Sequence, residues 1–274
     1  MSSATALGVA SLGGRVRMLA RSWPPIVSVV CVMALFELLS RADVIPRSAF
    51  PPLTATFETL GELLGEASFW TAVWDTLKGW GIGLGIAAGA AIPLGVLIGT
   101  SHLLYRSLRV PIEFLRPIPS VALIPLAILV YGTGIHSKVF LVVFAAFWQL
   151  LINTLYGVRD VDPVTIDTAR AFGLGPVERL GRITLPSAVP YIATGLRIAS
   201  TTALILAVTA ELVIGSPGLG REIELARQGG ANEIVYALIV VLGILGWVLN
   251  AGFSRLERRA LHWHPSQWSK GVAA

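Results

Sequence analysis

The 274-residue sequence has few charged residues and lacks the motifs of common catalytic and nucleotide-binding sites. Only 14% of its residues are charged, whereas about 25% is usual in soluble domains. No G-x-S-x-G, H-E-x-x-H or G-x-x-x-x-G-K-[ST] pattern occurs, and no lysine follows a glycine. We therefore expect no catalytic, metal or cofactor site in this chain, and any ATP would be bound by another polypeptide.

The cysteine count and the distribution of basic residues disfavour two further classes of protein, those with intrachain disulfides and those that bind nucleic acid. The lone cysteine, Cys31, excludes an intrachain disulfide. The net charge is +5, but the Arg and Lys residues are divided among four separate segments, so the pattern does not indicate nucleic-acid binding.

Long apolar runs are abundant, and 54% of the residues are hydrophobic. A helix needs about 20 apolar residues to span the hydrocarbon of a bilayer. Four uncharged runs meet this length, and two others contain one glutamate each, Glu37 or Glu211. The runs lack the alternation of barrel strands, so they predict an all-α polytopic membrane protein with six spanning helices. The predicted spans are 24–39, 79–100, 117–137, 139–158, 198–220 and 234–254.

Basic residues predict how these spans are oriented. With six spans, 14 Arg and Lys residues fall on the side of both termini and of the connection between the fourth and fifth spans, against five on the other side. Because Lys and Arg concentrate in cytoplasmic loops, both termini and that connection are expected in the cytoplasm. No cluster of cationic residues within the spans marks a tight anion site.

No linker divides the chain, so we predict one permease-like membrane domain, 24–254, between cytoplasmic tails 1–23 and 255–274. No small-x-small cleavage pattern follows Leu39, which favours an uncleaved first span over a signal peptide. In the outer segment 40–69, apolar residues spaced by three and four predict an amphipathic helix beginning near Leu53. Gly81, Gly85 and Gly89 recur every four residues and predict a close approach of a neighbouring helix.

A polar segment between two apolar runs, residues 159–186, carries the clearest local signals; we call it the coupling segment. Pro163 suits the first position of a short helix, and Gly173 with Gly175 would end it. Pro176 then suits the start of a second short helix, which Pro186 would end before the next span. Two short helices with a glycine corner would form a rigid protrusion; the alternative is an ordinary interfacial loop.

The spacing of the coupling segment resembles the Glu-Ala-Ala, three residues, Gly, nine residues, Ile-x-Leu-Pro signature of permease subunits of bacterial ATP-binding-cassette (ABC) importers. Two positions depart from that signature: Asp167 is shorter than Glu and Thr168 is bulkier than Ala. The resemblance implies that a cytoplasmic ATPase docks on this segment. The residues implied in coupling are Asp167, Thr168, Ala169, Ala171, Phe172, Gly173, Ile183, Leu185 and Pro186.

Further motifs, including Arg116-Pro117-Ile118-Pro119-Ser120 and Ala210-Glu211-Leu212, resemble the importer subgroup for taurine, alkanesulfonates and nitrate. This resemblance implies a permease in the bacterial inner membrane that pairs with a second copy. It also implies two ATPase subunits that bind ATP and Mg²⁺, and an external solute-binding protein.

Three polar residues within the spans are candidates for the translocation path. Gln149 and Asn153 lie four residues apart on one helix face, where they could line the path or bond neighbouring helices together. Glu211 is a costly charge at membrane depth, with a structural hydrogen bond or a role in the gate as alternatives. An ion-coupled secondary transporter is the competing class, although no pair of repeated halves with broken helices is evident.

Overall fold

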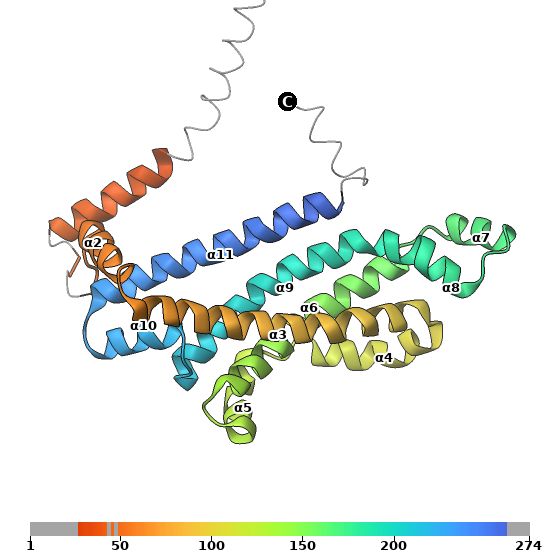
Figure 1. The fold of residues 1–274 in the computed structure, drawn as a ribbon, viewed down its shortest axis with the longest axis horizontal. Coiled ribbons are helices and arrows are strands. Elements are labelled where there is room, and N and C mark those ends of the chain that lie inside the picture. Colours follow the sequence, from red (N-terminus) through yellow and green to blue (C-terminus); the bar gives the residue numbers. More distant parts are fainter. Residues whose placement is uncertain (1–26, 43–44, 47–48, 262–274) are drawn as a thin grey trace, which may run out of the picture.

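The computed structural model describes residues 27–42, 45–46 and 49–261, and every regular element in these ranges is helical (Figure 1). The predicted all-α fold is confirmed, whereas the predicted tail 1–23 and residues 262–274 lie outside the described ranges. Residues 27–41 are helical. The elements after them are α2 (Leu53–Leu63), α3 (Ala67–Thr100), α4 (His102–Leu115), η1 (Ser120–Leu123), α5 (Ile124–Tyr131), α6 (Ile135–Arg159), α7 (Pro163–Ala171), α8 (Pro176–Arg179), η2 (Leu180–Thr184), α9 (Leu185–Ile214), α10 (Leu219–Gln228) and α11 (Asn232–Ala260).

Four described helices are long and apolar enough to cross a membrane: α3, α6, α11 and the continuous helix Pro176–Ile214, which contains α9. A fifth crossing arises if α4 and the helical run Ser120–Tyr131, bent by 82°, count as one span. Six spans are predicted from the sequence. The first of them begins outside the described residues, and its described part is the helix at 27–41.

The predicted third span, 117–137, is wrong as a single helix. Its residues form η1 and the eight-residue α5, and α6 begins before the predicted span would end. Pro117, Pro119 and Pro125 each remove a backbone N–H donor, and Gly132 ends α5 with a φ of 74°. Hydropathy registers none of these breaks, because residues 117–137 form an uncharged run that contains them all.

The predicted connection between the second and third spans is also a helix rather than a loop. Ser101 caps α4 by accepting a hydrogen bond from the N–H of Leu104 at 3.3 Å, and α4 then runs back beside α3 (Figure 1). Tyr105, Leu108 and Ile112 of α4 pack against the main core. The basic residues of this connection therefore lie along a helix and not in a loop at one end.

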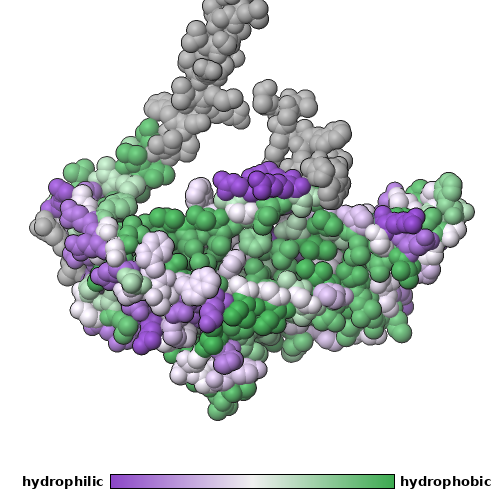
Figure 2. Space-filling model, viewed as in Figure 1, coloured by the Kyte–Doolittle hydropathy of each residue, from purple (hydrophilic) through white to green (hydrophobic). Residues whose placement is uncertain are grey.

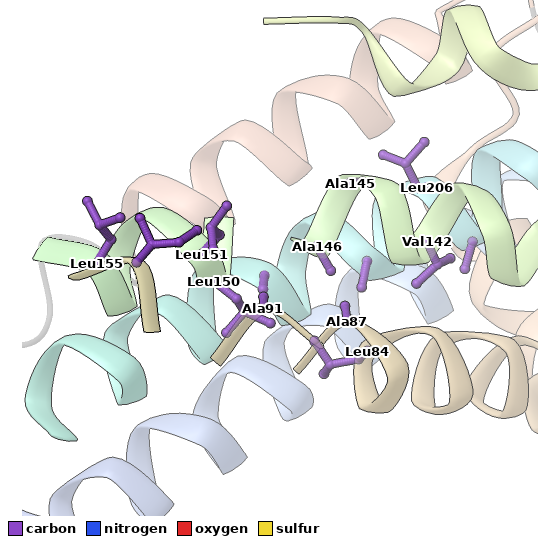
Figure 3. Close-up of a cluster of buried hydrophobic side chains, with 14 residues drawn as sticks. Leu84, Ala87, Ala91, Val142, Ala145, Ala146, Leu150, Leu151, Leu155 and Leu206 are labelled. Carbon is purple, nitrogen blue, oxygen red and sulfur yellow. The ribbon is translucent and has the colours of Figure 1, made fainter. Parts of the chain in front are cut away.

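The main core lies where α3, α6 and α9 pack against one another, and Figure 3 shows the side chains that these helices contribute. Glycines of α3 meet side chains of α6: an added Cβ at Gly83 would lie 2.4 Å from Cγ1 of Val142, and one at Gly95 would lie 2.7 Å from Cβ of Thr154. Small residues at such a seam let two helices approach closely and gain dispersion energy.

The predicted close approach at Gly81, Gly85 and Gly89 is not made within this chain. An added Cβ at any of the three would meet no atom within 4 Å. The face that packs on α6 includes Gly83 and Gly95 instead, which follow a four-residue spacing offset by two positions. A period of four fits several faces of one helix, so spacing alone selects the wrong one.

Hydrophilic residues gather at the two ends of the molecule and where α11 ends, whereas most of the surface between them is apolar (Figure 2). One end carries α2, which confirms the predicted amphipathic helix, together with α10; we call it the α10 end. The opposite end carries α7 and α8; we call it the α7 end. This distribution suits helices that cross an apolar layer with both ends in water.

Candidate functional site

The coupling segment begins with a well-capped helix. The Asp162 carboxylate accepts a hydrogen bond from the N–H of Val164 at 2.9 Å, and Pro163 occupies the first turn of α7. After Ala171 the chain turns through Gly173, whose φ is 78°, and the N–H of Leu174 bonds back to the carbonyl of Ala169 at 3.0 Å. This left-handed glycine ends the helix and reverses the chain toward α8.

The tip of the coupling segment exposes large apolar side chains. Val164 is 68% exposed, Phe172 80% and Val177 81%. Ala169 is the buried residue of α7, while Asp167 and Arg170 form an exposed ion pair of 2.9 Å beside the apolar residues. Exposed apolar groups rimmed by charges are typical of a surface that binds another protein.

The second short helix of the coupling segment, which begins at Pro176, is longer than predicted, because Pro186 does not end it. α8 continues through the π-helical turn η2 into α9, so that the helix runs unbroken from Pro176 to Ile214. Pro186 lies in the first turn of α9, after the wider turn of η2. Ile183 and Leu185 are half-buried on this helix. The second short helix of the coupling segment is therefore continuous with a spanning helix.

A cavity of about 1150 Å³ opens between the coupling segment and the adjoining ends of α6, α9 and α11. Asn153, Asp160 and Glu257 line it from α6 and α11, and Tyr191 of α9 donates a hydrogen bond to the Asp160 carboxylate. Arg197 of α9 pairs with Glu257 at 3.4 Å. The cavity is thus lined by three spanning helices and by the coupling segment.

The three candidate path residues are not gathered at one place. The Asn153 amide lines the cavity and donates to the backbone carbonyl of Gln149 at 2.7 Å, and Asn153 packs where Gly195 of α9 allows a close approach. Glu211 lies 16 residues beyond Gly195 in α9, which corresponds to about 24 Å along the helix. Gln149 and Asn153 therefore belong to the α7 half, and Glu211 belongs to the α10 half.

Glu211 lies in a fully bonded buried network near the α10 end. Its carboxylate accepts hydrogen bonds of 2.9 Å from the Lys138 ammonium, the Thr76 hydroxyl and the N–H of Gly220. The Lys138 ammonium also donates to the carbonyls of Asp75 and Pro217, at 3.0 and 2.8 Å. Both side chains of the pair are at most 1% exposed. Bonds to neighbouring helices, one of the two alternatives for Glu211, are thus present.

Lys138 and Thr76 are the members of this network that sequence reasoning misses. Lys138 is assigned to a loop because it separates two apolar runs, but it lies buried in the first turn of α6. A signal was available: a single base and a single acid, Lys138 and Glu211, each interrupt an apolar stretch. Unpaired charges at such depth are costly, so the two were candidates to pair.

Fold and site together define a multi-pass membrane protein whose spanning helices carry a protruding surface for a protein partner. The chain belongs to the family of binding-protein-dependent transport system inner membrane components, whose model matches residues 91–262. It is therefore a permease subunit of an ABC importer, which excludes the ion-coupled alternative.

Similar proteins agree with this assignment. The chain is 33% identical to the taurine transport system permease protein TauC of Escherichia coli over 78% of its length and 80% of the relative's. It is 29% identical to the nitrate import permease protein NrtB of Leptolyngbya laminosa, over 84% of this chain and 85% of that one. Among solved structures, the inward-facing MetNI methionine ABC transporter matches in fold with a TM-score of 0.62 at 21% identity, over 70% of this chain and 96% of that chain.

Proposed function

We propose that this permease carries a small anion such as a sulfonate, taurine or nitrate. The relatives named for taurine, nitrate and aliphatic sulfonates are 33%, 29% and 28% identical to it and match over most of its length. In this proposal the chain has no catalytic activity. Two copies form the path, two ATPase subunits bind ATP and Mg²⁺, and an external solute-binding protein delivers the solute.

The coupling segment and both chain termini lie in the cytoplasm in this proposal. The bias of 14 basic residues to five between the two predicted sides supports the orientation, although the three arginines of α4 now lie along a helix. The α7 end would then face the ATPase and the α10 end the solute-binding protein.

The apolar tip of the coupling segment is the single observation that carries the mechanism. Phe172 and Val177 are largely exposed on an arm that continues as α9. ATP-driven closure of the docked ATPase pair would move the tip, and α9 would move with it. The spanning helices would then alternate between outward and inward access.

Gly173→Arg tests the docking site. The φ of 78° strains any residue with a Cβ, and the guanidinium adds charge beside Phe172. We expect Gly173→Arg to abolish co-purification with the cognate ATPase and ATP-driven uptake. Gly173→Asn is the matched control, because Asn tolerates this backbone conformation, and it should retain most of both. Intact association and uptake in Gly173→Arg would contradict the proposed docking site.

Substrate class is tested separately, with the permease, its ATPase and its binding protein reconstituted in liposomes. We expect ATP-driven accumulation of radiolabelled taurine, nitrate or methanesulfonate. Uptake confined to solutes that carry neither a sulfonate group nor nitrate would refute the proposed substrate class and leave the importer mechanism in place.

A further inference from the structure

The histidine, arginines and glutamate of α4 and of its C-cap lie on one narrow face. His102, Arg106, Arg109, Glu113 and Arg116 follow one another at intervals of four and three residues. At 3.6 residues per turn they fall within an arc of about 80°. All five are exposed. We call this face the α4 arc.

The other faces of α4 are apolar and distinct from the arc. Leu108 and Ile112 pack on the main core. Leu103, Val110 and Phe114 form a third face and are 74%, 70% and 75% exposed. That third face suits lipid, because large aliphatic and aromatic side chains are stable in hydrocarbon. The charged arc is therefore directed neither at the core nor at the face that suits lipid.

Contacts with α6 show that the arc runs alongside a spanning helix. The Arg159 guanidinium, in the last turn of α6, lies 3.6 Å from the centre of the Tyr105 ring. Arg116 is eleven residues further along α4, or about 16 Å deeper into the molecule. It lines a cavity of about 160 Å³ with Ile152 of α6. The sequence places Arg116 in a connecting loop, whereas in the structure it caps the C-terminal end of α4.

The charges of the arc do not balance. The Glu113 carboxylate accepts a hydrogen bond of 2.8 Å from Arg109, with both side chains about 60% exposed. Within the described residues Arg106 and Arg116 form no ion pair with a carboxylate. Three guanidinium groups therefore face one carboxylate. Charged groups at membrane depth face protein or water, and an excess of positive charge there attracts anions.

We propose that the α4 arc lines the water-filled transport path and is a transient binding surface for small anions bearing a nitrate-like or sulfonate-like group. This inference rests on the proposed function and adds to it the residues that contact the solute within the permease. Arg116 and Arg109 supply guanidinium N–H donors that match oxyanion geometry. Glu113 competes for Arg109 and keeps the binding weak enough for release.

Thiol accessibility tests the water-filled path. Arg116→Cys, Glu113→Cys and, as matched controls on the apolar face, Val110→Cys and Phe114→Cys are introduced after Cys31→Ser. Each variant is expressed with the cognate ATPase in membranes and treated with the anionic sulfonatoethyl methanethiosulfonate. We expect modification at 113 and 116 to be at least about ten times faster than at 110 and 114, because the thiolate reacts only where water reaches it.

The sign of the potential is tested with the same thiols. The ratio of rates for the anionic reagent and the cationic trimethylammonium-ethyl reagent is measured at Glu113→Cys, with and without Arg109→Gln. Removing this positive charge, which lies one helical turn from position 113, should lower the ratio about five- to twenty-fold. Arg221→Gln, in α10 and outside the coupling segment, is the charge-matched control and should leave the ratio unchanged.

Two results would overturn the inference. Equal or reversed reactivity of the arc and the apolar face would exclude the water-filled path. A ratio insensitive to Arg109→Gln would exclude the anion-binding surface. Glu113→Cys keeps all three arginines, and co-purification with the ATPase shows that each variant is folded. None of these readouts requires transport. A negative result here would refute the anion-binding path alone, whereas intact association and uptake in Gly173→Arg would refute the proposed docking site.

Discussion

At the scale of single residues, the buried pair Lys138–Glu211 is the most consequential feature near the α10 end. The 2.9 Å pair joins α6 to α9, and the further bonds from Thr76 and to Pro217 bring in α3 and the turn before α10. Burial of two charges is costly, so such a pair adds little net stability, yet breaking it leaves one charge unpaired. The pair therefore specifies how these four segments fit together.

Removing one partner of this pair should destabilise the folded state much more than removing both partners. We expect Glu211→Gln to destabilise the folded state by about 3–5 kcal/mol, because Lys138 would stay buried without its counter-charge. The double variant Lys138→Met with Glu211→Leu should recover most of that loss. Thermal unfolding in detergent, followed by size-exclusion chromatography, measures both. A double variant less stable than Glu211→Gln would show that the pair contributes net stabilisation.

At the scale of helices, sequence reasoning succeeds where one element has one apolar run. Spans 79–100, 139–158 and 234–254 lie within α3, α6 and α11. It fails at 117–137, and at 198–220, where α9 ends at Ile214. Hydropathy reports the preference for lipid, whereas Pro117, Pro119, Gly132 and Gly215 decide where helices end. It also misses α4, because the charged residues of that helix place it outside every apolar run. The functional residues show the same contrast between local and long-range information. Local capping signals predict α7, but the packing of distant helices decides which residues meet Glu211.

The seam between α3 and α6 gives a test at this scale. An added methyl at Gly83 would lie 2.4 Å from Val142, whereas one at Gly85 would meet no atom within 4 Å. We expect Gly83→Ala to destabilise the fold by about 1–3 kcal/mol through overpacking. Gly85→Ala should be neutral or stabilising by up to about 1 kcal/mol, since Ala favours helix. Thermal unfolding measures the stability of both variants. Equal effects of the two substitutions would show that Gly83 does not lie at the contact between α3 and α6.

At the scale of the whole molecule, the two ends are linked by α9. Its extension through η2 toward the α7 end forms the second short helix of the coupling segment, and its other end carries Glu211 in the network with Lys138. A helix is stiff over such a length, so a displacement at the tip reaches the α10 end without a series of small side-chain changes. Continuity of the helix, and not only docking of the ATPase, is then required for transport.

Inserting two glycines after Gly181, within η2, should separate docking from transport. The apolar tip with Phe172 and Val177 would remain, so the cognate ATPase should still co-purify. The flexible insertion would absorb the motion, and ATP-driven uptake in proteoliposomes should fall at least about ten-fold while ATP hydrolysis continues. The same insertion after Gly230, in the turn between α10 and α11, is the control and should spare more uptake. Full uptake with the insertion in η2 would show that force reaches the spanning helices through α6 or through contacts of α7, and not along α9.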